Sequence, residues 1–510
     1  MNDALNAQEA VLAFLADPAS HGGQPARRID THAASVFLAG ERALKVKRAV
    51  RFPFLDYSTL VKRKAACEAE LAVNSPFAPA IYCRVVPITR EANGKLAIAG
   101  AGTPVEWAVE MRRFDETRTL DHIAGEIDER LANALGEAVA AAHATAPVVD
   151  AASWIAALAT YLDQNLEAFR ASPDLFAPAA VAVLDRLARA TYARIAALLA
   201  ARGQQGRVRR GHGDLHLGNI VLMDNRPVLF DAIEFDPLIA SGDVLYDLAF
   251  LLMDLCERGL RQAATVVLNR YLASTPCTAD LDGLAALPFF LSMRAAIRAK
   301  VTAARMERAE GPGRAAIGST AQTYFDFARR AISPPAPQFI AVGGLSGTGK
   351  TLLARALAPR LGPMPGAVIV RTDFERKALF GVGETETLPA TAYQPAVSER
   401  VYASVLQKAR RILTAGHSAI ADAVFARPSE RAAVAAAAKT TGVPLRGLFL
   451  TAGLTTRLTR VGHRAPDASD ADARVTREQE QYSLGAIDWA AIDASGAPEE
   501  TLARALAALN

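Results

Sequence analysis

The spacing of apolar residues changes along the first part of the chain. Short runs such as SVFLAG, ALKVKR, IYCRVVPI and EWAVEM either alternate apolar with polar residues or stay apolar, which indicates β-strands. One segment among them, STLVKRKAACEAELAV, has apolar residues at helical spacing. From about residue 118 to 205 the chain becomes rich in alanine, again with helical spacing. We therefore expect a strand-rich lobe over about 1–115 and a helical lobe over about 116–331.

A proline-rich segment, residues 332–338 with the sequence ISPPAPQ, should separate this domain from the rest of the chain. Proline stops a helix and stiffens a connector. Beyond it the short apolar runs FIAVGG, AVIVRTD, SAIADAVF and LRGLFLTA are separated by helical stretches. This alternation predicts a second domain, residues 339–510, of the α/β class with a mostly parallel sheet.

Composition and charge narrow the class of protein. The 510 residues are 51% hydrophobic and 22% charged, and 57 Lys and Arg against 53 Asp and Glu leave a net charge of +4. Such a slight excess disfavours nucleic acid or an anionic membrane as a partner. Four widely separated cysteines predict neither a disulfide framework nor a zinc site. Acidic residues near the N-terminus and the lack of a long uncharged apolar run predict a cytoplasmic protein. The oligomeric state stays open.

The strongest motif is GLSGTGKT at residues 344–351, which satisfies G-x-x-x-x-G-K-[ST] between a predicted strand and a predicted helix. The backbone amides of such a loop and the helix N-terminus bind phosphate groups. The residues that we expect to bind ATP here are Gly344, Ser346, Gly347, Thr348, Gly349, Lys350 and Thr351. Lys350 should reach the β- and γ-phosphates, and the Thr351 hydroxyl should bind Mg²⁺.

Two aspartates end predicted strands of the same domain: Asp373 closes AVIVRTD and Asp422 closes SAIAD. One carboxylate could accept the proton of an attacking hydroxyl while the other holds magnesium, although acidic helix N-caps also occupy such positions. Further on, Arg457 and Arg464 in TTRLTRVGHR could close over the transferring phosphoryl group or form a solvated helix face.

This half resembles the small P-loop kinases, such as gluconate kinase, zeta toxin, chloramphenicol phosphotransferase and polynucleotide 5′-kinase. The resemblance implies that Asp373 faces the acceptor hydroxyl as the base, that Asp422 lies on the metal side, and that a lid supplies arginines. The segment after Asp373 carries three glutamates near Arg376 and Lys377. These acids favour a compact neutral or cationic acceptor over a nucleic-acid end.

A second set of polar residues lies in GHGDLHLGN and the following VLFDAIEFD. Asp214, Asn219 five positions later and Asp231 after a predicted hairpin have the arrangement of a kinase catalytic loop and metal-binding strand. Asp214 would accept the acceptor's proton, and Asn219 and Asp231 would hold magnesium. The H-G-D form resembles the aminoglycoside phosphotransferase and choline kinase branch, which implies an α+β protein-kinase-like domain. A polar hairpin loop is the structural alternative.

The strand-rich lobe should supply a lysine that grips the nucleotide phosphates. Lys45 and Lys47 lie on the same face of one predicted strand, and we prefer Lys45. Its partner should be Glu68 or Glu70 on the predicted helix, with a weak preference for Glu70. The alternative is a solvated basic strand edge. The run VEWAVEMRRF resembles the connection between the two kinase lobes and implies that Met111 lies near the adenine.

Two further features belong to this half. It lacks a G-x-G-x-x-G loop over the nucleotide, and only Gly40 lies at the predicted strand turn. Asp243 and Asp247 flank and enter the apolar run VLYDLAFLLMDL, where we expect them to brace the catalytic loop by hydrogen bonds, because buried acids need partners.

The order of these motifs resembles one bacterial family, the bifunctional aminoglycoside phosphotransferase-like/ATP-binding proteins. The resemblance implies an enzyme that uses ATP and Mg²⁺ at two nucleotide sites and phosphorylates a hydroxyl group of a small molecule. It does not imply antibiotic resistance, because "aminoglycoside" is here a fold label. The alternatives are a regulatory ATPase with a pseudokinase-like N-terminal half and a polynucleotide 5′-kinase-like enzyme. The complete Asp214–Asn219–Asp231 set disfavours the first alternative, and the small net charge disfavours the second.

Overall fold

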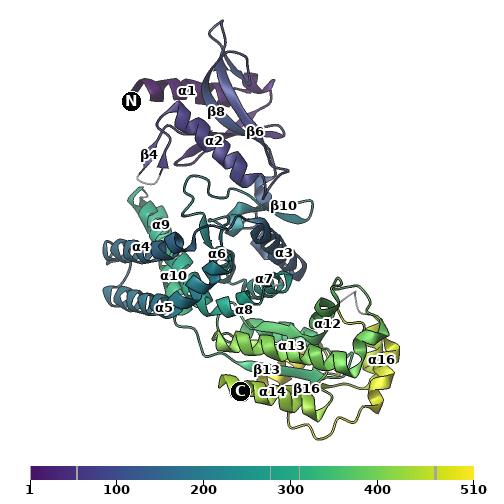
Figure 1. Cartoon of the computed structure of the whole chain (residues 1–510). Helices are drawn as coiled ribbons and strands as arrows, with labels where there is room; N and C mark the ends of the chain where they lie inside the picture. Colours follow the sequence, from purple (N-terminus) through teal and green to yellow (C-terminus); the bar gives the residue numbers. More distant parts are fainter. Residues whose placement is uncertain (1, 53–54, 276, 309, 464–467, 510) are drawn as a thin grey trace. The chain divides into compact units, whose positions relative to one another are not determined.

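The computed structural model describes residues 2–52, 55–275, 277–308, 310–463 and 468–509 (Figure 1). The chain forms two compact units. The first comprises residues 1–161 and 199–254, and the second comprises 162–198 and 255–510. Within the described ranges, no helix combines the length and the apolar character needed to cross a membrane.

An antiparallel sheet of six strands forms the strand-rich lobe of the first unit, in the order β1-β2-β3-β8-β6-β7. Its strands are β1 (Ala26–Asp30), β2 (Ala34–Ala39), β3 (Arg42–Lys47), β6 (Tyr82–Arg90), β7 (Leu96–Ile98) and β8 (Thr103–Arg112). A small hairpin, β4 (Arg51–Phe52) and β5 (Leu55–Asp56), follows β3. The predicted strand-rich character of this region is confirmed.

Two helices pack on this sheet, whereas the sequence predicted one. Helix α1 (Asn2–Ala16) buries Val11, Leu12 and Leu15 against apolar side chains of β2, β3, β6 and β8. Helix α2 (Leu60–Asn74), the predicted one, begins where the Thr59 hydroxyl accepts a hydrogen bond from the Lys62 amide. Because side chains alternate along a strand, β3 directs Leu44 and Val46 toward α1 and its lysines toward α2.

The rest of the first unit carries the motifs of the catalytic loop. Helix α3 (Glu129–Thr145) precedes a pair of antiparallel strands, β9 (Val208–Arg210) and β12 (Ser241–Asp243). Between them lies the hairpin of β10 (Ile220–Met223) and β11 (Arg226–Leu229). The long apolar run predicted as a helix is α6 (Val244–Glu257).

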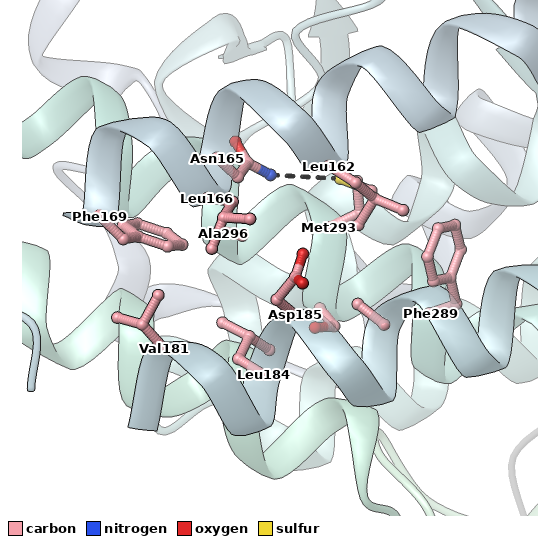
Figure 2. A pocket seen from close by; sticks show the side chains of 12 residues that line it. Leu162, Asn165, Leu166, Phe169, Val181, Leu184, Asp185, Phe289, Met293 and Ala296 are labelled. Atoms are coloured by element: carbon pink, nitrogen blue, oxygen red, sulfur yellow. Dashed lines mark hydrogen bonds between the residues drawn. The ribbon is translucent and has the colours of Figure 1, made fainter. Parts of the chain in front are cut away.

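Helices that precede the proline-rich segment also contribute to the second unit. They are α4 (Ala151–Arg170) and α5 (Pro178–Gln204), each shared between the units, and α7 (Arg261–Ser274), α8 (Ala279–Gly283), α9 (Leu287–Ala304) and α10 (Gly311–Ile332). Figure 2 shows a narrow cavity among α4, α5 and α9, where the Asn165 amide approaches the Met293 sulfur at 3.4 Å. Its volume of about 20 Å³ has room for about one water molecule.

The C-terminal part of the second unit is an α/β domain whose five strands are all parallel, in the order β14-β15-β13-β16-β17. The strands are β13 (Phe339–Gly344), β14 (Val368–Arg371), β15 (Ala419–Asp422), β16 (Leu445–Thr451) and β17 (Ala490–Asp493). The helices are α11 (Lys350–Leu357), α12 (Thr372–Phe380), α13 (Pro395–Thr414), α14 (Pro428–Thr441), α15 (Leu454–Gly462), α16 (Ala473–Glu478) and α17 (Pro498–Leu509). The predicted α/β class is confirmed, although strand β17 was not predicted because AAID is short and weakly apolar.

Within the second unit, helix α7 covers the edge strand β14. The Asn269 side chain donates to the Ala367 carbonyl at 3.1 Å and accepts from the Ile369 amide at 2.7 Å, so it takes the place of a neighbouring strand. Arg261 donates to the carbonyls of Pro365 and Gly362 in the segment before β14. These contacts satisfy backbone groups that a free sheet edge would expose.

Candidate active sites

In the first unit, Lys45 lies between two carboxylates. Its Nζ is 2.7 Å from Glu70 Oε1 and 2.6 Å from Asp231 Oδ1. Glu70 is fully buried on α2, whereas Glu68 is exposed and lies 3.6 Å from Lys64. The structure thus brings together three predicted site residues from a strand, a helix and a loop, and it places Glu70 rather than Glu68 beside the lysines.

The charges in this cluster stabilise each other. Burial alone would lower the pKa of Lys45, but Asp231 and Glu70 outweigh that effect and hold the pKa well above its usual value. Burial would raise the pKa of Asp231, and Lys45 brings it below the usual range, while the nearby charge of Asp214 opposes this decrease. All three groups are therefore ionised near neutral pH.

The backbone around Asp231 is clamped by residues that the sequence analysis did not identify. Asp231 has φ +62°, and its amide donates to the Tyr82 hydroxyl at 3.1 Å. The Asn74 side chain, at the end of α2, accepts from the Ala232 amide at 2.7 Å and donates to the Ala232 carbonyl at 3.1 Å. Such partners cannot be identified from spacing, because they lie more than a hundred residues from Asp231 in the sequence.

The predicted catalytic loop forms a compact turn around Asp214. Asn219 Nδ2 donates to the Asp214 carbonyl at 2.9 Å and to its carboxylate at 3.1 Å, which orients the carboxylate. Asp247 on α6 accepts from the amides of His212 and Gly213 at 2.8 and 2.9 Å. A β-carbon at Gly211 would lie 2.5 Å from the Asp247 carboxylate, so this close approach requires glycine.

Of the two aspartates expected to hydrogen-bond to the catalytic loop, Asp243 has a different partner. Asp247 contacts the catalytic loop as expected, but Asp243 forms a bidentate ion pair with buried Arg202, with both distances 2.6 Å. The second residue of α6 that supports the loop is Asp254, about two helical turns after Asp247, which accepts from the Leu217 amide at 2.9 Å. The expectation for Asp243 was wrong because Arg202, which lies 41 residues earlier, neutralises it.

Met111 lies at the end of β8, half-buried in an apolar cluster with Val221, Met223 and Phe230 of the β10–β11 region. This cluster joins strands of the strand-rich lobe to the hairpin that follows the catalytic loop. Gly40 lies in the β2–β3 turn with φ +57°, a conformation that favours glycine.

The second candidate site is the loop between β13 and α11. Gly344, Gly347 and Gly349 have φ values of +137°, +82° and +91°. A β-carbon on Gly347 would lie 2.6 Å from the Arg457 carbonyl, so the loop also needs glycine for packing. The Thr348 hydroxyl donates to the Leu345 carbonyl at 2.8 Å, and Lys350 Nζ donates to the same carbonyl at 3.2 Å.

A chain of polar contacts leads from this loop to the predicted base. The Thr351 hydroxyl donates to Asp422 Oδ2 at 2.7 Å, and Arg371 Nε lies 3.4 Å from the same oxygen. Arg371 also approaches Asp373 Oδ2 at 3.6 Å and lies over the Phe374 ring. Arg371 was not predicted as a site residue, although its position at the end of a buried strand, two residues before Asp373, was a usable signal.

The sequence predicted that Asp373 ends a strand, and this prediction is wrong. Strand β14 ends at Arg371, and Asp373 belongs to the first turn of α12. The carboxylate gains from the helix dipole there, and about a third of the side chain is exposed. Asp422 is the last residue of β15, as predicted, and is only 4% exposed.

Arg457, which was expected on a mobile lid or a solvated helix face, is buried instead. Arg457 is 1% exposed on α15 and forms an ion pair with Glu480, and its Nε and Nη1 have no hydrogen-bond partner among the described residues. Gln479, which directly precedes Glu480, accepts from the Ser346 amide of the phosphate loop at 2.7 Å through its side-chain oxygen. Arg464 lies outside the described residues. Arg457 is therefore a buried cation against the loop rather than a residue of an exposed face.

The acids that follow Asp373 are largely neutralised. Glu375 lies 2.6 Å from Lys408, and Glu384 forms an ion pair with Arg270. Lys377 is buried 2.7 Å from Asp470, whose other oxygen accepts from the Tyr393 hydroxyl at 2.6 Å. The charge argument for a neutral or cationic acceptor therefore loses force, because two of the three glutamates are paired with cations, while the Glu386 carboxylate accepts from the Gly383 amide.

The donor sets in both halves fit magnesium. Among the residues that the structure describes, no group of three or more His, Cys, Asp or Glu side chains could hold a metal ion by itself. Magnesium instead takes one or two protein oxygens together with substrate phosphates and water. The Thr351 hydroxyl and the Asp422 carboxylate, 2.7 Å apart in the second unit, are oxygen donors of this kind. The first unit has the Asp231 carboxylate beside Lys45 and the Asn219 side chain beside Asp214.

Comparison with known families agrees with this arrangement. Residues 47–287 match the phosphotransferase enzyme family, and residues 339–483 match the AAA domain. Proteins of Mycobacterium tuberculosis (strain ATCC 25618 / H37Rv) and Mycobacterium bovis (strain ATCC BAA-935 / AF2122/97), both named as uncharacterized, are 29% identical over 489 residues, which cover 93% of this chain and 94% of each relative.

Two solved structures are each similar to part of the chain. A choline/ethanolamine kinase family protein from Mesorhizobium loti is 14% identical, with a TM-score of 0.37, and the match covers 64% of this chain and 99% of that one. A gluconokinase from Sinorhizobium meliloti 1021 is 21% identical, with a TM-score of 0.26, and the match covers 34% of this chain and 93% of that one.

Proposed function

Because the chain joins a domain of the phosphotransferase enzyme family to an AAA domain with a phosphate-binding loop, we propose that it is an ATP- and Mg²⁺-dependent phosphotransferase with two nucleotide sites. Each site would transfer the γ-phosphate of ATP to a hydroxyl group of a small molecule. The observation that carries this proposal is the Glu70–Lys45–Asp231 cluster near Asp214, in which a cation for phosphate and an acid for magnesium are held together.

In the phosphotransferase half, Lys45 would bind the nucleotide phosphates and Glu70 would hold it in place. Asp231 and Asn219 would hold magnesium, which neutralises phosphate charge when bound. The Asp214 carboxylate, oriented by Asn219, would accept the proton of the acceptor hydroxyl as its oxygen attacks the γ-phosphorus. Met111 would contact the adenine from the end of β8.

In the P-loop half, the backbone amides of the loop, together with Lys350, would bind the phosphates. Thr351 and Asp422, already hydrogen-bonded to each other, would hold magnesium directly or through water. Asp373, at the N-terminus of α12, would act as the base, and the unpartnered nitrogens of Arg457 would bind a phosphate oxygen. Arg464 would supply a second cation.

Calorimetric titration tests the presence of two nucleotide sites. With a non-hydrolysable ATP analogue and Mg²⁺, we expect two nucleotides per chain. Lys350→Ala should remove one site, and Lys45→Met should remove the other. Complete loss of binding in Lys350→Ala alone would contradict the proposal and favour a regulatory ATPase with a pseudokinase-like half.

The acceptor class needs a separate measurement. We propose a small hydroxylated molecule and a cytoplasmic site of action. Label from γ-labelled ATP should pass to members of a panel of small alcohols, with weak dependence on salt, and Asp373→Ala should abolish the share due to the P-loop half. Strong, steeply salt-sensitive labelling of oligonucleotide 5′-ends would instead support a polynucleotide kinase, because phosphate contacts release counterions.

A further inference from the structure

A second lysine on β3, Lys47, is buried beside the phosphotransferase site. Its side chain is only 3% exposed, and Nζ lies 2.6 Å from Glu70 Oε2. The other oxygen of Glu70 contacts Lys45. One carboxylate therefore divides its two oxygens between two ammonium groups, and nothing in the proposed phosphate contacts yet uses Lys47.

Lys47 also connects β3 to the segment that carries Asp231. It forms an ion pair with Glu234, which is 7% exposed and accepts from the Tyr57 hydroxyl at 3.1 Å. Glu234 lies three residues after Asp231 and shares its loop. Lys47 therefore holds the helix residue Glu70 and the loop residue Glu234 at once.

The balance of charge between these lysines and the carboxylates around them explains why the site needs a second lysine. Two ammonium groups, Lys45 and Lys47, face the three carboxylates Glu70, Asp231 and Glu234. If Lys45 turns toward a nucleotide, Glu70 and Asp231 lose part of their neutralisation. Magnesium can compensate Asp231, but Glu70 is fully buried and would keep an uncompensated charge without another cation, which is strongly unfavourable.

We propose that Lys47 and Glu234 are positioning residues of the phosphotransferase half. Lys47 keeps Glu70 and Glu234 neutralised, so that Lys45 can exchange Asp231 for the nucleotide phosphates. Glu234 anchors the Asp231 loop to β3 through Lys47. This inference rests on the proposed function of the same site, and it concerns residues for which the family resemblance assigned no role or left the choice between two lysines open.

The test measures nucleotide binding rather than turnover. In a Lys350→Ala background, calorimetry reports only the phosphotransferase site. Lys47→Met should raise the Kd of the Mg²⁺-bound ATP analogue at least about tenfold, because Glu70 then retains Lys45. Lys64→Met removes a lysine of an exposed pair on α2 and is the matched control, with an unchanged Kd.

Glu234→Gln supplies an independent test if Lys47→Met folds poorly. Loosening the Asp231 loop should raise the Mg²⁺ concentration for half-maximal analogue binding by about tenfold, as loss of supporting contacts around metal ligands does. Urea unfolding of each variant should be run in parallel, because a merely structural role would lower the unfolding midpoint and leave the Kd and the Mg²⁺ requirement of the folded protein unchanged.

The outcomes separate this inference from the function on which it rests. If Lys45→Met abolishes binding while Lys47→Met and Glu234→Gln bind the analogue and Mg²⁺ as the wild type does, Lys47 and Glu234 have no positioning role and the proposed function stands. If Lys45→Met also binds normally, the proposed nucleotide site itself is wrong.

Discussion

At the scale of single residues, the chemistry of the phosphotransferase half depends on one carboxylate. Asp214 is oriented by Asn219 within its own turn, so its replacement should leave the cluster around Lys45 in place. In a Lys350→Ala background, we expect Asp214→Asn to keep its affinity for the ATP analogue while phosphoryl transfer falls about 10²–10⁴-fold, as for loss of general-base catalysis. Single-turnover transfer from γ-labelled ATP measures this step.

The control for that variant is Asp224→Asn in the exposed β10–β11 turn, which changes the same functional group away from the site. Its transfer rate should equal that of the Lys350→Ala parent. Equal rates in Asp214→Asn and the parent would show that this half is catalytically silent.

At the scale of elements, helix α2 determines where Glu70 lies. Its first turns are anchored by Arg63, whose Nε lies 2.9 Å from both oxygens of the fully buried Glu106 on β8. Arg63→Met would leave this carboxylate without its cation, and we expect the free energy of unfolding to fall by about 3–5 kcal/mol. Urea unfolding, followed by tryptophan fluorescence, checks the loss.

Lys62→Met is the matched control for the helix. Lys62 is the neighbouring residue and pairs with Asp56 at the surface, so its removal should change stability by no more than about 1 kcal/mol. The double variant Arg63→Met/Glu106→Gln should be more stable than Arg63→Met alone. Similar losses for Arg63→Met and Lys62→Met would show that the buried pair does not anchor α2.

At the scale of the whole molecule, packing joins helices of the phosphotransferase half to the P-loop sheet within one unit. The contact depends on Asn269, which pairs with both backbone groups of edge strand β14. Asn269→Ala would leave the Ala367 carbonyl and the Ile369 amide without this side-chain partner. We expect a loss of about 1–3 kcal/mol in the unfolding of the second unit and faster hydrogen exchange at Ile369.

An exposed contact between the same regions supplies the comparison. Arg411 on α13 pairs with Asp282 on α8 at 2.8 Å, with both side chains more than a third exposed, so Asp282→Asn should cost at most about 1 kcal/mol. Hydrogen exchange that is equally slow at Ile369 in wild type and Asn269→Ala would show that α7 does not protect the edge of the sheet.

The sequence alone determined the motifs and elements that depend on residues close together in the chain. The loop GLSGTGKT carries its glycines where positive φ values and close backbone approach require them. Asp214 and Asn219 are five residues apart and hydrogen-bond within one turn. Periodicity predicted the main strands and helices, but it missed α1 and several short strands, among them β1, β7 and β17.

Only the tertiary structure decided which distant residues meet. Lys45 and Lys47 lie on the same face of β3, so spacing could not distinguish them. Both contact Glu70 of α2, and the loop that carries Asp231 distinguishes them, because it pairs Lys45 with Asp231 and Lys47 with Glu234. Likewise, Asp243 forms an ion pair with Arg202 instead of contacting the catalytic loop, and Glu480 pairs with Arg457 inside the P-loop half. Ion pairs depend on distances in space between elements that are separated in the sequence, and hydrophobic periodicity specifies only which face of each element is buried.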